Sequence, residues 1–202
     1  MRILEKKERS LGAKLFLKAE RCNSTKCAAV KRPYKPGPHT KSFKKVSEYG
    51  KQLTEKQKVR FSYGLTEKQL KKYFVFADKG TDPTHEAMIK FLESRLDNAV
   101  FRSGLAASRR IAKQLVGHGH IMVNGRKVTI PSYSVRVDDL ITIRPESAGQ
   151  VLFTSLDEKF KNFEVPEWIK LDKDNKSALI ISEPKGIEVP FDMDLVVNYY
   201  LK

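Results

Sequence analysis

The residues best suited to chemistry in this 202-residue chain are cations and amides gathered between Ser108 and Lys127. A helix over Ser108–Val116 turns by about 100° per residue, which separates a polar half from an apolar half. Ser108 can cap its first turn, and Gly117 or Gly119 can end it. The polar half carries Arg109, Arg110, Lys113 and Gln114, and the apolar half carries Ile111, Ala112, Leu115 and Val116.

A hairpin is predicted directly after this helix. Ile121–Val123 is typical of a short strand, Asn124-Gly125 is a strong two-residue turn signal, and Arg126 and Lys127 lie on the return strand. Helix and hairpin together would offer a compact cationic surface with amide and imidazole donors, which suits a phosphate backbone. The plain alternatives are a solvated helix face and, for His118 and His120, a shaped turn. Residues 104–137 contain no Asp or Glu, whereas a solvated helix usually mixes charges, so we favour binding.

The charge of the whole chain points to a polyanionic partner. The formal net charge is +15, and residues 1–50 carry 14 Lys and Arg against 4 Asp and Glu, whereas residues 151–202 carry 7 against 10. No apolar run reaches the ~20 residues of a membrane-spanning helix, and no signal-peptide core is visible. We therefore expect a cytoplasmic protein without membrane contact.

The cysteine content argues against a metal centre. Cys22 and Cys27 are the only cysteines, and a structural zinc site needs about four ligands. His39 is the only nearby candidate for a third ligand. We expect reduced thiols, no metal and no cofactor.

The elements that must position these residues indicate an α+β fold. We expect a short helix within residues 12–27, then an extended basic arm over residues 31–45 whose rings could stack on bases. Thr54 and Thr66 each precede a Gln by three residues, a capping-box pattern that predicts two short helices. A long helix is expected from Thr84 to about Arg102. Strands are expected at 140–143, 168–171 and 177–181, Trp168 is expected in the core, and 192–202 fits helix or strand.

The Ser108–Lys127 segment, with its Gly-His-Ile-x-Val-Asn-Gly run, resembles the RNA-binding module named after ribosomal protein S-four. The module also occurs in some pseudouridine synthases and tyrosyl-tRNA synthetases. The resemblance to the bacterial S-four family of small-subunit ribosomal proteins extends along nearly the whole chain. It includes Pro-Gly-x-His at 36–39, Ser-x-Tyr at 47–49, Glu-Lys-Gln-Lys at 55–58, Tyr-Gly-Leu-x-Glu-x-Gln at 63–69, Glu-Ser-Arg-Leu-Asp-Asn at 93–98, Pro-Ser-Tyr-x-Val-Arg at 131–136 and Pro-x-Trp-Ile at 166–169.

This resemblance implies a domain organisation and a role. It implies a basic extension at 1–45, a helical lobe at 46–93 completed by 166–202, and the RNA-binding module at 94–165. It implies binding to a multi-helix junction in the 5′ domain of small-subunit rRNA, nucleation of subunit assembly, and a contribution to translational accuracy at an interface with ribosomal protein S-five. Ribosomal protein S-three and mRNA at its point of entry are further implied partners. Some family members carry a four-cysteine metal site, of which Cys22 and Cys27 match the second pair, while Glu5 and Glu8 stand at the first.

Residue by residue, we expect RNA contacts along the basic extension, the helical lobe and the module. Arg95 and Arg102 have an alternative, because they could pair with Asp97 or cover the core. The predicted RNA-binding residues are Lys31, Arg32, Lys35, His39, Lys41, Lys44, Lys45, Lys56, Lys58, Arg60, Arg95, Arg102, Arg109, Arg110, Lys113, Gln114, His118, His120, Asn124, Arg126 and Lys127.

The competing hypothesis is an RNA-modifying enzyme that carries the same module. Arg95-Leu96-Asp97 resembles the Arg-Leu-Asp of pseudouridine synthases, whose aspartate is catalytic. Here it falls within the module, and no separate catalytic domain follows. The chain also lacks a Gly-rich phosphate loop and a nucleophile elbow, so we predict that it is not an enzyme.

Overall fold

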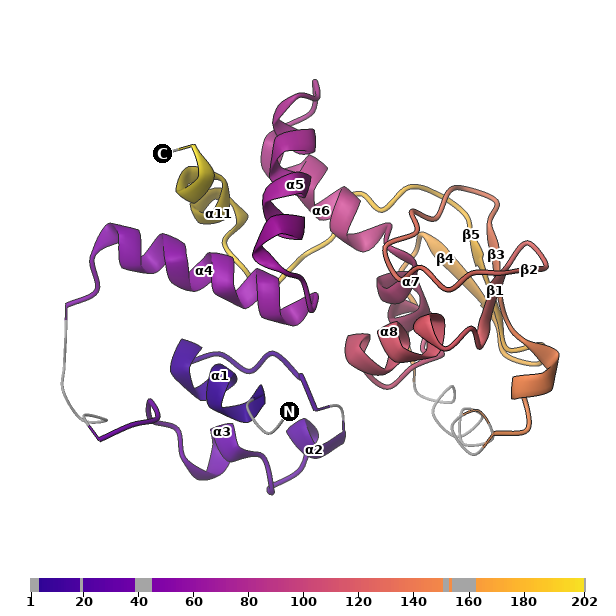
Figure 1. The fold of residues 1–202 in the computed structure, drawn as a ribbon, viewed down its shortest axis with the longest axis horizontal. Helices are drawn as coiled ribbons and strands as arrows, with labels where there is room; N and C mark the ends of the chain where they lie inside the picture. Colours follow the sequence, from indigo (N-terminus) through magenta and orange to yellow (C-terminus); the bar gives the residue numbers. More distant parts are fainter. Residues whose placement is uncertain (1–3, 19, 39–44, 151–152, 154–162, 202) are drawn as a thin grey trace. The chain divides into compact units, whose positions relative to one another are not determined.

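The computed structural model describes residues 4–18, 20–38, 45–150, 153 and 163–201 (Figure 1). The predicted contacts His39, Lys41 and Lys44 therefore lie outside the described residues. The chain divides into two compact units: a helical unit, Met1–Met88 with Glu188–Lys202, and a module unit, Ile89–Ile187. The α+β class predicted from the sequence is confirmed.

The helical unit begins with three short helices and continues with longer ones that carry good caps. Thr66 and Gln69 form the predicted capping box, with Thr66 Oγ1 accepting from Gln69 N–H at 3.3 Å and Gln69 Oε1 accepting from Thr66 N–H at 3.0 Å. The preceding helix begins earlier than predicted, because Ser47 caps it and Thr54 lies inside it. The helices are α1 (Leu4–Leu11), α2 (Glu20–Asn23), α3 (Ala28–Lys31), α4 (Glu48–Ser62), α5 (Glu67–Asp78), the start of α6 (Thr84–Glu93), and α11 (Met193–Tyr200).

The undecided last segment is helix α11, which packs against α4 and α5 (Figure 1). The Tyr200 hydroxyl donates to Glu67 Oε1 at 2.8 Å, and the Tyr200 ring stacks on Phe74 with 5.1 Å between centroids. Val59, Leu70 and Val196 are fully buried beneath these contacts. Residues about 130 positions apart in sequence thus complete one core.

The single long helix predicted over Thr84–Arg102 is wrong. It breaks at Ser94–Arg95 into α6 and α7 (Leu96–Arg102), because the backbone there is extended and pairs with a distant segment. Arg95 forms an antiparallel bridge with Ser134, and Leu96 N–H donates to Tyr133 O at 2.8 Å. Hydrogen bonds from a segment almost 40 residues away therefore override the helical periodicity.

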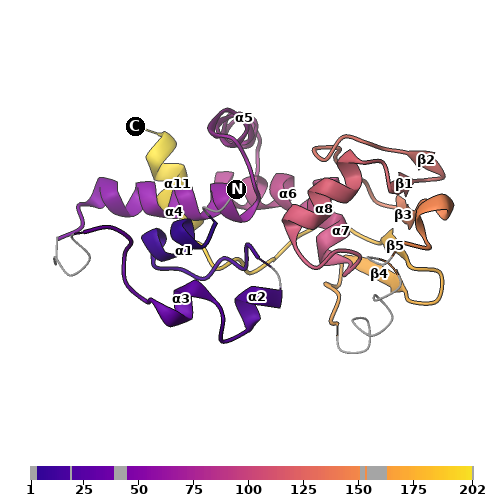
Figure 2. The same cartoon turned by 60° about the horizontal axis from the view of Figure 1, so that its bottom comes forward.

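The module unit combines α7 and α8 (Arg109–Gly117) with a five-stranded antiparallel sheet in the order β2-β1-β3-β5-β4. The two helices lie side by side in both views (Figures 1 and 2). Their apolar faces and the sheet share one core, which includes Leu96, Leu115 and Ile141, and Trp168 is buried as predicted. The strands are β1 (Ile121–Val123), β2 (Arg126–Lys127), β3 (Leu140–Ile143), β4 (Ile169–Asp172) and β5 (Ser177–Ile180).

The two units do not coincide with the sequence-based division, since residues 1–45 group with the helical unit and the boundary falls after Met88 instead of after residue 93. Residues 166–187 were expected to complete the helical lobe, but they group with the module unit. The cause is strand pairing, since β5 pairs with β3 through Ile141↔Ala178 and with β4 through Lys170↔Leu179. Only residues 188–202 return to the helical unit.

Candidate nucleic-acid interface

Helix α8 presents the two faces predicted from its sequence. Ser108 caps it by accepting from Ile111 N–H at 3.3 Å, while Ala112, Leu115 and Val116 are buried. Arg110 and Gln114 are exposed on the opposite side, and Lys113 is half-buried. The helix therefore fixes a cationic face by burying its apolar one.

The predicted hairpin follows with the expected geometry. Asn124 and Gly125 have φ values of 50° and 75°, as a type I′ turn requires, and Met122 pairs with Lys127. Gly119, with φ 76°, lies beneath the Lys127 side chain, where a β-carbon would collide with it. The end of the Lys127 side chain therefore lies beside the turn that follows α8. We call the exposed or half-exposed polar side chains here the module surface: Arg110, Lys113, Gln114, His118, Arg126 and Lys127.

Acidic groups are sparse beside the module surface. Asp139 is buried, and its carboxylate accepts from Asn124 Nδ2 and from Arg136 N–H, both at 2.8 Å. Glu146 pairs with Arg144, whose hydrogen bond lowers the pKa of Glu146, with a smaller contribution from the charge of Lys127. The six residues of the module surface thus include four cations and no acidic residue, while Asp138 and Glu146 are exposed elsewhere in the module unit.

Two of the predicted contacts, His120 and Asn124, are used inside the module. The Asn124 side chain joins the turn to β3, because it donates to Asp139 and its Oδ1 accepts from Leu140 N–H at 2.8 Å. His120 Nδ1 lies 2.9 Å from Ser147 Oγ, and its ring meets Phe153 edge-on. His120 therefore contacts other parts of the module, in line with the structural alternative to RNA binding, whereas the His118 side chain is exposed.

Buried carboxylates hold three predicted arginines. Asp97 pairs with Arg95 through two contacts of 3.0 and 2.6 Å, and both side chains are at most 5% exposed. Glu93, fully buried, accepts from Arg102 at 2.8 and 3.0 Å and lies 3.6 Å from Arg109. Arg95 is thus absent from the surface of this chain, whereas Arg102 and Arg109 keep 25% and 20% of their side chains exposed.

The predicted contacts of the helical unit also separate into buried and exposed groups. Lys56 is buried, donates to Glu67 at 2.8 Å and lies 4.1 Å above the Tyr199 ring. Burial alone would raise the pKa of Glu67, but the hydrogen bonds from Lys56 and Tyr200 hold it below its usual value. Burial and the same hydrogen bond raise the pKa of Tyr200. Lys58 pairs with Glu55, Arg60 with Gln57 and Glu67, and Lys31, Arg32, Lys35 and Lys45 are exposed.

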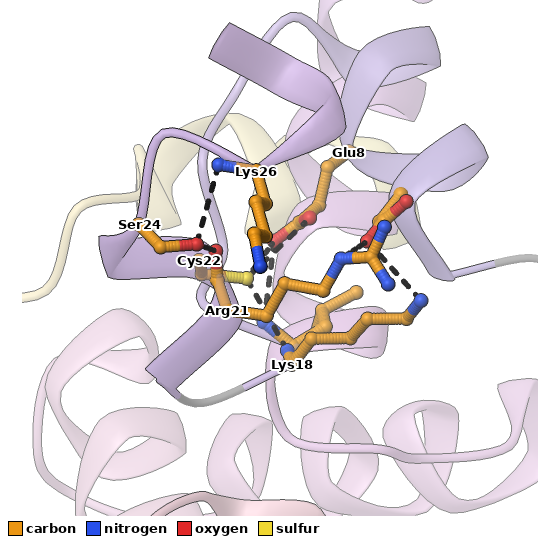
Figure 3. Close-up of polar contacts among 8 residues, drawn as sticks. Glu8, Lys18, Arg21, Cys22, Ser24 and Lys26 are labelled. Atoms are coloured by element: carbon orange, nitrogen blue, oxygen red, sulfur yellow. Dashed lines mark hydrogen bonds and ion pairs between the residues drawn. The ribbon is translucent and has the colours of Figure 1, made fainter. Parts of the chain in front are cut away.

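Glu8 organises the segment around Cys22 (Figure 3), and Glu5 adds ion pairs to the same segment. Glu8 is buried, and its Oε1 accepts from Leu15 N–H at 3.0 Å and Leu17 N–H at 3.2 Å, with the Cys22 thiol 4.0 Å away. Glu5 pairs with Lys18 at 3.1 Å and with Arg21 at 3.0 Å.

These residues do not fit a four-cysteine metal site. Burial chiefly raises the pKa of the Cys22 thiol, and the nearby Glu8 charge adds to this, which disfavours the thiolate that a metal requires. The carboxylates of Glu5 and Glu8, which stand at the positions of the first cysteine pair, already contact protein groups. In the described part of the chain no group of three or more His, Cys, Asp or Glu is placed to hold a metal.

Sequence reasoning missed several cations. Arg136 is exposed and falls within the acid-free stretch that identified the module surface, so that same signal could have found it. A pocket of about 600 Å³ in the helical unit, which we call the amino-terminal pocket, is lined by further cations, among them Lys6, Arg9, Arg21 and Lys26. No periodic pattern in the sequence marks them as one site, because they alternate with Glu5 and Glu8. No described helix is long and apolar enough to cross a lipid bilayer.

The helix pair α7–α8 and the hairpin after it lie in a segment that matches a known domain. Residues 94–141 match the model of the S4 domain, and residues 4–93 match that of the ribosomal protein S4/S9 N-terminal domain. The small ribosomal subunit protein uS4 of Kosmotoga olearia is 44% identical over 95% of this chain and 93% of its own. The corresponding proteins of Acetivibrio thermocellus (uS4) and Alkaliphilus metalliredigens (uS4A) are 45% and 46% identical over the same shares.

The chain therefore belongs to the uS4 family of bacterial small-subunit ribosomal proteins. It is an rRNA-binding structural protein of translation and not an enzyme, as predicted. Asp97, the candidate catalytic residue of the pseudouridine synthase hypothesis, is nearly buried and is paired with Arg95.

Proposed function

We propose that the chain binds the 5′ domain of small-subunit rRNA at a multi-helix junction and thereby nucleates assembly of the subunit in the cytoplasm. The observation that carries the proposal is the module surface, where Arg110, Gln114 and His118 stand exposed at one end of a hairpin that adds Arg126 and Lys127. Arginine forks can bridge phosphate oxygens, and lysine ammonium groups neutralise them. Duplex RNA hides its base edges in a deep groove, so recognition is expected through shape, phosphates and 2′-hydroxyls.

Arg102 and Arg109 extend the proposed contact. Glu93 holds their guanidinium groups from beneath, at 2.8–3.6 Å, while part of each side chain stays exposed. A buried carboxylate that fixes two arginines reduces the side-chain entropy lost on binding. Of the remaining predicted contacts, the exposed Lys31, Arg32, Lys35 and Lys45 are retained in the proposal, whereas the buried Lys56 and Arg95 stabilise the fold.

The proposal includes protein and mRNA neighbours on the strength of the family resemblance. Contact with ribosomal protein S-five would link the chain to translational accuracy. Lys45, with Lys41 and Lys44, would lie near the point where mRNA enters, beside S-three. The acidic balance of residues 151–202, 7 Lys and Arg against 10 Asp and Glu, supports a protein-facing rather than an RNA-facing role for that segment.

Binding of the purified protein to a 5′-domain rRNA fragment, against an unrelated structured RNA of equal length, tests the proposal across a salt series. We expect a preference for the rRNA that survives near-physiological salt. Equal affinities that both collapse as salt rises would reveal only counterion release and would refute site-specific binding.

A charge reversal at Asp174, which is exposed in the β4–β5 turn, provides the matched control. Asp174→Lys should leave rRNA preference intact if the acidic segment faces protein. Asp172 is unsuitable for this purpose, because it accepts from Asp174 N–H and Asn175 N–H, both at 3.1 Å, and shapes the turn.

A further inference from the structure

Asn124-Gly125 is the only Asn-Gly pair in the sequence, and it combines a structural requirement with a chemical liability. The type I′ turn needs a positive φ at both positions, 50° and 75° here, which Asn and Gly adopt readily. The same pair is especially prone to deamidation, because Gly125 has no side chain to hinder attack by its own backbone nitrogen. The turn therefore selects a dipeptide that is chemically short-lived.

Deamidation at such a pair is an intramolecular reaction. The Gly125 backbone nitrogen loses its proton to base and attacks the side-chain carbonyl carbon of Asn124. The new C–N bond closes a succinimide, while the bond to Nδ2 breaks and this nitrogen takes up a proton and leaves as ammonia. Water then opens the ring at either carbonyl, which leaves aspartate or isoaspartate at position 124. The reaction needs only water and base, and both residues are exposed to solvent.

Both polar atoms of the Asn124 side chain are held by the strand next to the turn. Nδ2 donates to Asp139 Oδ1 and Oδ1 accepts from Leu140 N–H, both at 2.8 Å. These contacts direct the carboxamide across to β3, which lies beside β1 in the sheet (Figure 1). Attack by the Gly125 nitrogen rotates the carboxamide over its own peptide bond, so both contacts must break first.

Asp139 is itself fixed, so it can hold the Asn124 side chain in place. Asp139 is buried, and its Oδ2 accepts from Arg136 N–H at 2.8 Å. Its backbone carbonyl accepts from Ile180 N–H at 3.1 Å, which ties it to β5. A hydrogen bond to a charged acceptor is stronger than one between neutral groups. The protection of Asn124 therefore comes from contacts across the sheet and not from the dipeptide.

Neither product of deamidation fits the site as Asn124 does. An aspartate at position 124 would place a second carboxylate against Asp139, where the amide now donates, and the like charges would repel each other. Isoaspartate would add a methylene group to the backbone of a two-residue turn and disturb the register in which Met122 pairs with Lys127. A modified hairpin therefore cannot close as it did before.

We propose that Asn124 is a site of spontaneous deamidation that hydrogen bonds from its side chain to Asp139 and Leu140 keep closed in the folded chain. Local opening of the hairpin exposes the site to reaction. The modification then accumulates in chains whose hairpin has opened and marks them permanently. This inference does not depend on RNA binding, because its readout is a covalent change measured without RNA.

The rate of deamidation in the full-length chain at mildly alkaline pH tests the inference. Peptides containing position 124 are released by pepsin at acid pH, where the reaction is slow, and are quantified by mass spectrometry. Asp139→Ala should raise the rate by about tenfold or more, as expected for the loss of a hydrogen bond to a charged group. The matched control is Glu146→Ala, which removes an exposed carboxylate that pairs with Arg144 in the same unit. It should react as slowly as the wild type.

The outcomes decide the inference whether or not the variant folds. Wild-type rates in an Asp139→Ala chain that circular dichroism shows to be folded would overturn it, as would equal acceleration in Glu146→Ala. If Asp139→Ala does not fold, the wild type decides. Its rate in concentrated guanidinium chloride should exceed its rate in buffer by about tenfold or more, and equal rates would show that the fold does not protect Asn124.

Discussion

The module surface and the amino-terminal pocket are both cationic, but they are built on different foundations. The module surface rests on α8 and a hairpin, whose apolar sides are buried in a core that includes Leu115, Val116 and Ile121. The pocket rests on helices of eight, four and four residues, too short to persist alone. The buried Glu8 and the half-buried Glu5 add contacts to the backbone and to basic side chains, beside a small set of buried residues that includes Leu15 and Cys22. Cationic side chains can therefore be positioned on a surface mainly by hydrophobic packing beneath them or by contacts with internal acidic residues.

The module also contains a buried carboxylate, but there it refines a surface that packing has already made. Glu93 aligns Arg102 and Arg109 at the edge of α7 and α8. In the helical unit, Glu8 fixes the backbone itself through Leu15 and Leu17. Substitutions of these two glutamates should consequently damage different units.

Glu93→Ala should have the largest effect on stability, lowering the free energy of unfolding of the module unit by about 3 kcal/mol or more. It leaves Asn98, Arg102 and Arg109 without their shared acceptor. Hydrogen exchange of the two units measures the loss. Equal loss of protection in both units would show that they do not unfold separately, and Glu93 would then not act on the module unit alone.

Glu8→Ala should lower the stability of the amino-terminal helices by about 2 kcal/mol, because two backbone N–H groups lose their acceptor. Protection of α8 and the hairpin should stay as in the wild type. Glu8→Gln is the control, since its amide oxygen can still accept. A melting curve of Glu8→Ala that matches the wild type would show that Glu8 does not organise the pocket.

Arg110→Ala should leave stability unchanged and flatten the salt dependence of rRNA binding by about one unit, the loss of one phosphate contact. Arg110 is exposed and lies on the polar face of α8. Lys170→Ala, which removes an exposed cation from β4, is the matched control. An unchanged slope for Arg110→Ala would remove this residue from the interface.

The smallest expected effect is a pH response of the helical unit. The folded chain holds the pKa of Glu67 below its usual value of 4.5, so this group contributes stability above that pH and loses it as pH falls through the folded pKa. Glu67→Gln should be slightly less stable than the wild type at pH 7. The difference in unfolding midpoint should shrink toward pH 3; a constant difference would contradict the role given to the Lys56 and Tyr200 hydrogen bonds.

The features that the sequence predicted well are local ones. Ser108, the apolar spacing of α8 and Asn124-Gly125 act over a few residues, so helix, hairpin and exposed cations could be read directly from them. Arg136 shared the same signal and was overlooked. The β4 and β5 strands were found for the same reason, because each has its own short apolar run.

The features that could not be predicted depend on distant partners. The break at Arg95 requires Ser134, and the burial of Lys56 requires Tyr199 and Tyr200 on a helix about 140 residues later. The amino-terminal pocket joins residues of α1, α2, α3 and the segments between and after them, next to Glu8, whose burial no periodicity reveals. From the sequence alone, charged residues in a basic segment are expected to be solvated, because their ion-pair partners become visible only in the folded structure.

The return of α11 to the helical unit has a consequence for the order in which the chain acquires structure during its own synthesis. All of Ile89–Ile187 is synthesised after Met88 and before Glu188, so the helical unit stays without its last helix for the whole time in which the module unit is made. At roughly 5–20 residues per second this interval lasts several seconds or more. Val196 and Tyr200 therefore close the core of the unit that began first only after every residue of the module surface has been synthesised.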